Sequence, residues 1–155
     1  MRILKTILVS TIVLLSGFGC SEDSSVEPIE EEHIETESLV IIQKSEVIVR
    51  YINGDVWGIL QIGEGERTPL LSVKFVDPQT DTLFTPDEDE YNFEATVSDE
   101  MIATFERFRY EDWAFYIHGQ AQGATDLIIR IMHGDHADFE SLPIPILVSS
   151  KANSD

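Results

Sequence analysis

The histidines and carboxylates near the C-terminus are the residues best suited to chemistry in this sequence. Two histidines lie three residues apart in the segment His133-Gly134-Asp135-His136-Ala137-Asp138-Phe139-Glu140. On a straight strand, side chains at this spacing point to opposite faces, so the two can share an ion only if the chain turns between them. Gly134 permits such a turn. Imidazole nitrogens combined with a carboxylate such as Asp138 suit zinc, copper(II) or nickel(II), so the pattern predicts a divalent transition-metal site.

A third histidine could complete this site. His33 lies in Glu30-Glu31-Glu32-His33-Ile34-Glu35, before the first predicted strand. A start of the form His-x-Glu, with an end of the form His-Gly-x-His-x-Asp-Phe, resembles small bacterial lipoproteins that carry both segments. The resemblance implies one site formed by both ends of the domain. From the nitrogen and carboxylate ligands, zinc is favoured, with copper as the other candidate. Its ligands would be His33, Glu35, His133, His136 and Asp138.

The His-x-x-His pattern also occurs in solvated acidic loops without an ion, so a metal-free surface is the alternative to the predicted site.

Other acidic and histidine segments are predicted to have no metal-binding role. Trp113, Phe115 and Ile117 form the inward face of their strand, and His118 therefore points the other way. Residues 87–90 are all acidic but lack the spacing and the central Gly of an EF-hand loop, so they are predicted to be solvated.

The N-terminal residues are typical of an export signal. Arg2 and Lys5 precede an apolar run that ends at Gly19, and this run is shorter than the roughly 20 residues that a membrane-spanning helix needs. Cys20, the only cysteine, follows directly and resembles the acylated first residue of bacterial lipoproteins. The resemblance implies a signal peptide over residues 1–19 and a lipid anchor in the bacterial envelope, with the outer membrane as the expected location. The small residues before Cys20 also suit the ordinary signal peptidase, which would release a soluble protein with a free thiol.

The charge of the chain limits its partners. The formal net charge is −19, and removal of residues 1–19 would take away Arg2 and Lys5 but no acid, giving −21. Such a field repels nucleic acids and attracts cations, so DNA and RNA are excluded as partners. With one cysteine the chain can form no intrachain disulfide and no cysteine-rich metal site, so packing must stabilise it.

The remaining sequence predicts an all-β domain over residues 38–150, after an acidic, flexible tether over residues 20–37. Short β-branched and aromatic runs alternate with turn residues, and Asn53-Gly54 is a strong hairpin signal. Residues 99–109 could alternatively form one short helix. Trp57 and Trp113 lie inside apolar runs and are expected in the core. The runs are residues 39–43, 47–52, 56–62, 70–76, 91–97, 102–106, 113–118, 127–133 and 143–149.

The second half of the domain resembles the bacterial immunoglobulin-like domains called BIG2. Ile102-Ala103-Thr104-Phe105 corresponds to a strand of that family, and Gln122-Gly123-Ala124-Thr125 corresponds to the turn that precedes its closing strands. The similarity covers about residues 59–149, and the Trp-Ser-Ser segment of the family is absent. It implies an immunoglobulin-like, two-sheet antiparallel β-sandwich, in which the first and last strands often lie together. It implies no activity, because such folds carry function in separate sites.

These features favour a binding protein over an enzyme. No nucleophile elbow or phosphate loop is present. The first hypothesis is a lipid-anchored envelope protein that binds a divalent metal, zinc above all, as a carrier or as an accessory to an outer-membrane receptor. The second hypothesis is a metal-free protein-interaction or adhesion module.

Overall fold

Twelve strands make up the described part of the chain, which comprises residue 34 and residues 36–150. Most of them follow the period-two alternation of the sequence, with apolar side chains on one face only. No helix occurs in this part, and therefore none that could cross a membrane. Residues 99–109, for which a short helix was the alternative prediction, form a turn and a strand. The strands are β1 (Ser38–Gln43), β2 (Glu46–Ile52), β3 (Asp55–Gly58), β4 (Leu60–Gly63), β5 (Leu71–Val76), β6 (Leu83–Phe84), β7 (Tyr91–Val97), β8 (Ala103–Arg107), β9 (Ala114–Gly119), β10 (Gly123–His133), β11 (His136–Glu140) and β12 (Ile144–Ser149).

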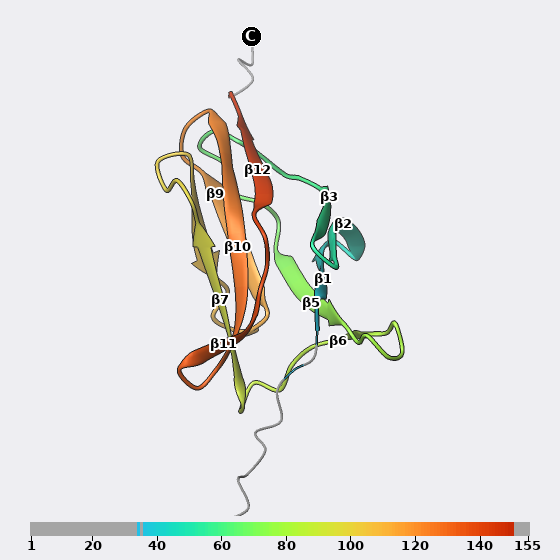
Figure 1. The fold of residues 1–155 in the computed structure, drawn as a ribbon. Helices are drawn as coiled ribbons and strands as arrows, with labels where there is room; N and C mark the ends of the chain where they lie inside the picture. Colours follow the sequence, from blue (N-terminus) through green and yellow to red (C-terminus); the bar gives the residue numbers. More distant parts are fainter. Residues whose placement is uncertain (1–33, 35, 151–155) are drawn as a thin grey trace, which may run out of the picture. The chain divides into compact units, whose positions relative to one another are not determined.

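The strands form two sheets that pack face to face as a β-sandwich. The first has the order β3-β2-β1-β5-β9-β8, with β6 paired to β5, and the second has the order β11-β10-β12-β4, with β7 paired to β10. Figure 1 shows β7, β10 and β12 in one layer and β1, β2, β3 and β5 in the other. The predicted all-β, two-sheet fold is therefore confirmed. One pairing departs from the antiparallel prediction, because β12 and β4 run parallel.

The turns between the first strands explain their pairing. Asn53 and Gly54 both have positive φ angles, of 50° and 89°, which is the conformation of the hairpin turn that the sequence predicts there. Lys44 and Ser45 adopt the same left-handed region between β1 and β2, at 48° and 70°. Because neither residue favours that region, the sequence contains no signal for this turn.

The predicted strand over residues 56–62 is divided in two. Gly58 has a φ of +101°, and a Cβ atom there would lie 2.2 Å from the Ile48 carbonyl oxygen, so only glycine fits. After this break β3 stays at the edge of the first sheet, while β4 joins the second. The prediction that Trp57 lies in the core is wrong, because its side chain faces outward from the edge strand and is 52% exposed.

The core lies between the two sheets and is rich in aromatic rings. Trp113, Phe115, Ile117, Leu127, Ile129 and Ile131 are all buried, as the alternation predicts. Trp113 packs edge-to-face on Phe75, with ring centroids 5.5 Å apart, and Phe75 packs in the same manner on Phe139. Phe139 belongs to β11, so this aromatic contact fixes the hairpin of β10 and β11 against the first sheet.

Candidate metal centre

The hairpin formed by β10 and β11 brings His133 and His136 to the same face. The two histidines are directly paired in the antiparallel register, and only Gly134 and Asp135 lie between them. Gly134 has a φ of +59°, which is the left-handed conformation that a two-residue hairpin needs at its first position. Side chains of directly opposed residues lie on one side of a sheet. The turn that the sequence requires for a shared site is therefore present.

A β-bulge adds Asp138 to the two histidines. Ile131 pairs with Phe139 and Met132 pairs with Ala137, so Asp138 is the extra residue on β11. A bulge interrupts the alternation and re-aims the side chain of the inserted residue. The Asp138 side chain is only 2% exposed and lies beside both imidazoles. Without the bulge, Asp138 and Phe139 would face opposite sides of the sheet.

The distances within this cluster are short. Asp138 Oδ1 lies 3.0 Å from His136 Nε2, and Asp138 Oδ2 lies 3.8 Å from His133 Nδ1. One ligand atom from each of the three residues lies within 4.8 Å of the others. Ligands bound to a tetrahedral zinc ion at about 2.0 to 2.1 Å are about 3.3 Å apart, so the widest pair would have to close by about 1.5 Å. His136, whose side chain is 44% exposed, has room for this movement.

The backbone of residue 34 is part of the same site. The Ile34 N–H donates a hydrogen bond of 3.2 Å to Asp138 Oδ2, which joins the segment before β1 to the hairpin near the end of the domain. Beside it, a groove is lined by Ile34, Thr36, Glu37, Pro78 and Asp138. The contact joins residue 34 to the cluster, whereas the part of His33 and Glu35 in the site stays a prediction.

One wall of the site is aromatic. Tyr91 of β7 pairs with His133 in the strand register, and its buried ring lies 4.9 Å from the imidazole. The ring covers one side of His133 and restricts water there, whereas His136 stays open to solvent. The place of Tyr91 in this site was not predicted, because its position beside His133 depends on the pairing of two strands that are distant in sequence.

Three of the five predicted ligands are thus brought together: His133, His136 and Asp138. His33, Glu35 and the predicted lipidation site Cys20 lie outside the described residues. His118 lies apart from the cluster, as predicted, and its ring pairs with Glu106 on β8. Asp135 is fully exposed in the turn, with a carboxylate oxygen 3.7 Å from His136 Nδ1, and it adds negative charge beside the site.

Two nitrogen ligands and one carboxylate oxygen are a suitable set for Zn²⁺ or Cu²⁺. No thiolate is available, and Asp138 is already held by the Ile34 N–H, as carboxylate ligands of metals generally are. Three ligands leave one tetrahedral position for water, a further side chain or a partner. The chemistry open to such a site is capture of a divalent cation, which the negative field of the protein would concentrate.

No family model matches this chain. No curated protein matches it either. Among solved structures, domains 4 and 5 of the S-layer protein SbsC are similar, with 18% identity and a TM-score of 0.42 over 57% of this chain and 46% of that one. Domains 5–6 of the same protein share 20% identity, with a TM-score of 0.39 over 58% of this chain and 39% of that one. The chain thus spans less than half the length of these structures. The sandwich assignment rests on the observed strand pairing, and the similarity to BIG2 domains stays a prediction.

Proposed function

We propose that this chain is a non-catalytic interaction module of the bacterial cell envelope. A Trp residue at an open sheet edge supports the proposal. Trp57 projects outward from β3, which is the last strand of its sheet, and half of its side chain is exposed. Exposed aromatic rings are enriched at protein interfaces, and the outer backbone groups of an edge strand are open to a partner. A receptor or another envelope protein is the partner that this edge suits best.

The contact can be tested on intact cells with a photo-crosslinking amino acid in place of Trp57. The matched control carries the same amino acid in place of Met101, which is 81% exposed and lies in a loop. A discrete adduct from position 57 that is absent from position 101 would support the module. No adduct at position 57, or the same adducts at both positions, would contradict it.

We further propose that the module binds a divalent transition metal, with zinc favoured over copper. The observation that carries this proposal is the convergence of His133, His136 and the buried Asp138 on one face of a hairpin. The predicted ligands His33 and Glu35 flank Ile34, whose N–H is already bonded to Asp138. Binding should weaken at acid pH, because an imidazole must lose its proton to coordinate.

Calorimetry with Zn²⁺ and with Cu²⁺ tests the metal site. His133→Ala and His136→Ala should each lower the affinity at least tenfold, and His33→Ala should do so if both ends of the domain contribute. The matched control is His118→Ala, which removes an imidazole that lies outside the cluster. Weak, salt-screened binding that survives His133→Ala combined with His136→Ala would refute the site and leave the acidic surface as its cause.

Attachment to the membrane through Cys20 is a separate proposal. Buried acyl chains contribute about 0.8 kcal/mol per methylene, far more than an acidic segment could contribute to membrane binding. The wild-type protein should therefore partition into detergent, and Cys20→Ala should not. Recovery of the wild type as a soluble protein with a titratable thiol would disprove the anchor.

A further inference from the structure

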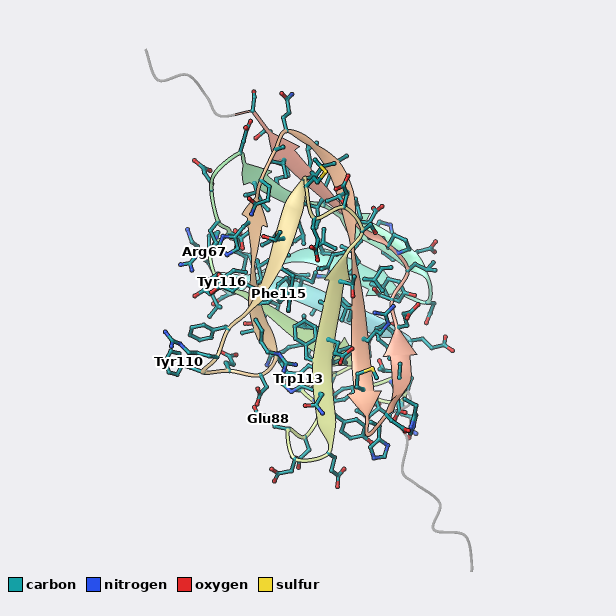
Figure 2. The ribbon with its side chains drawn as sticks, turned by 90° about the vertical axis from the view of Figure 1, so that its left-hand side faces the viewer. Arg67, Glu88, Tyr110, Trp113, Phe115 and Tyr116 are labelled. Carbon is teal, nitrogen blue, oxygen red and sulfur yellow. The ribbon has the colours of Figure 1, made fainter. Side chains whose placement is uncertain are left out.

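A second pocket of different chemistry lies at the edge formed by β8 and β9. Three arginines and three aromatic rings line it: Arg67, Arg107, Arg109, Phe108, Tyr110 and Tyr116. They come from the segment before β5, from the end of β8 and the loop that follows it, and from the outward face of β9. Figure 2 shows Arg67, Tyr116 and Tyr110 along one side of the molecule, whereas Trp113 and Phe115 lie further inside.

The charge of this pocket is opposite to that of the protein. The chain has ten Lys and Arg residues against 29 acids, yet three of the ten line this one pocket. The only acid in the lining is Glu106, which is shared between His118 and Arg67, the latter at 4.0 Å. Like charges held together repel one another, and an anion that binds between them relieves this repulsion.

Aromatic rings hold two of the arginines in place. The Arg67 guanidinium lies 4.0 Å from the centroid of the Tyr116 ring, and that of Arg109 lies 5.0 Å from the Tyr110 ring. Phe108 packs edge-to-face against both tyrosines, with centroids 5.5 and 5.7 Å away. A guanidinium stacked on a ring keeps the N–H donors along its edge available, and its orientation is fixed before a ligand arrives.

The three arginines differ in what they already bind. Arg107 donates a hydrogen bond to the Phe93 carbonyl oxygen, so it joins the end of β8 to β7. Arg67 has the single ion-pair contact to Glu106, at the limit of such contacts. For the Arg109 guanidinium, the described residues provide ring contact with Tyr110 but no hydrogen-bond acceptor. The donors of Arg67 and Arg109 are therefore the ones available to a ligand.

These observations select a ligand class. Guanidinium groups bind carboxylate and phosphate oxygens through paired N–H donors. Tyr110 is 74% exposed and offers an apolar ring face on which the C–H groups of a sugar ring can pack. A long polyanion would be repelled by a chain of net charge −19, so the ligand must present its anionic group locally. We propose that this pocket binds an anionic saccharide, a sugar unit that carries a carboxylate or a phosphate group.

The test is NMR titration of the full mature chain with chelator present, so that the outcome does not depend on the metal site. Glucuronate and glucose 1-phosphate are the two anionic probes, and glucose and inorganic phosphate are the controls for charge and for ring. Signals of Arg67, Tyr110 and Tyr116 should shift with at least one anionic sugar and not with glucose. The probe that binds tells whether the anion is a carboxylate or a phosphate.

Two variants separate the pocket from general electrostatics. Arg67→Gln combined with Arg109→Gln should weaken binding at least tenfold, whereas Arg50→Gln combined with Lys74→Gln removes the same charge elsewhere and should leave it unchanged. Tyr110→Ala should weaken binding of the anionic sugar more than that of inorganic phosphate, because it removes the ring face for the sugar as well as the support of Arg109. The proposal is overturned if neither sugar binds, if glucose binds equally well, or if both double variants weaken binding alike. Binding that is indifferent to Tyr110→Ala would also overturn it, because a simple anion site would then suffice. Thermal unfolding of each variant confirms that the fold is intact.

Discussion

Replacement of Asp138 separates its structural role from its proposed metal-binding role. The side chain accepts a hydrogen bond from the Ile34 N–H and lies beside two imidazoles. Asp138→Ala removes the acceptor and the charge together. Asp138→Asn keeps an acceptor oxygen and nearly the same shape but removes the charge. The two variants should therefore differ in stability and agree in their loss of metal affinity.

The expected size of the stability change follows from the Ile34 contact. Loss of the partner of a buried donor costs about 1 to 3 kcal/mol, and the lower part of this range applies because the Ile34 bond is only partly buried. For a domain of this size, about 1 to 2 kcal/mol corresponds to a fall in Tm of about 4 to 8 °C for Asp138→Ala. Asp138→Asn should cost less than about 1 kcal/mol without metal, since the N–H keeps an acceptor.

The assay is thermal unfolding with chelator and with excess Zn²⁺. Metal bound only by the folded state should add about 2.7 kcal/mol at a concentration 100-fold above Kd. The wild type should gain this stabilisation, and both Asp138 variants should lose most of it. If Asp138→Asn keeps the full zinc-dependent gain, Asp138 is not a ligand. If Asp138→Ala and Asp138→Asn lower the chelator-treated Tm equally, the Ile34 bond does not account for the stability.

Three further predictions concern the fold and its titration. Ile129→Ala should destabilise the domain by about 2 to 5 kcal/mol, because the side chain is fully buried, whereas Arg130→Ala, which removes the exposed Arg130–Glu140 pair, should cost less than about 1 kcal/mol. Urea unfolding of both variants measures the difference, and similar costs would contradict the assigned faces of β10. Gly58→Ala should destabilise the domain clearly more than Gly65→Ala, because a Cβ at residue 58 meets the Ile48 carbonyl and one at residue 65 meets nothing within 4 Å. Gly65→Ala should cost about 1 kcal/mol for its left-handed φ alone. Equal losses of stability on thermal unfolding would show that the break after β3 is not steric. Backbone N–H groups of Thr80 and Gln79 lower the pKa of Asp77, so Asp77 contributes stability that is lost as pH falls through its folded pKa. A hydrogen bond and charge repulsion from Asp112 raise the pKa of Glu88, so Glu88 contributes stability that is lost as pH rises through its folded pKa. Carboxyl NMR titration should show the two pKa shifts in opposite directions, with the Glu88 shift reduced by Asp112→Ala.

The strands could be predicted from the sequence because burial in a sandwich preserves period-two alternation. β7 and β10 bury every second residue over most of their length, and neither depends on an unusual backbone conformation. Trp57 shows where hydrophobicity misled the prediction. Val56, its neighbour on β3, pairs with the buried Tyr51 and packs inward, so Trp57, of the opposite parity, faces outward. Its parity was a better guide to its position than its apolar character.

The cluster of His133, His136 and Asp138 could be predicted only in part, because its geometry depends on pairings between distant segments. The spacing of His133 and His136 around Gly134 was a local signal for a turn, and the hairpin of β10 and β11 contains that turn. The bulge at Asp138 was not a local signal, since it depends on how β11 aligns with β10. The anionic-ligand pocket left even less trace, because Arg67 is 40 or more residues away from Arg107, at the end of β8, and from Arg109 in the loop that follows.

The bulge at Asp138 gives the hairpin two roles that an unbroken strand could not combine. Phe139 must face the core, where it packs on Phe75 and Tyr51. Regular alternation would then turn Asp138 to the outer face of the sheet, away from the imidazoles. The extra residue lets both side chains lie on the inner side, at the cost of one interrupted pairing. An unpaired carboxylate there would be costly, and the Ile34 N–H offsets this cost from the start of the domain. The candidate site and the attachment of the segment before β1 therefore depend on the same side chain.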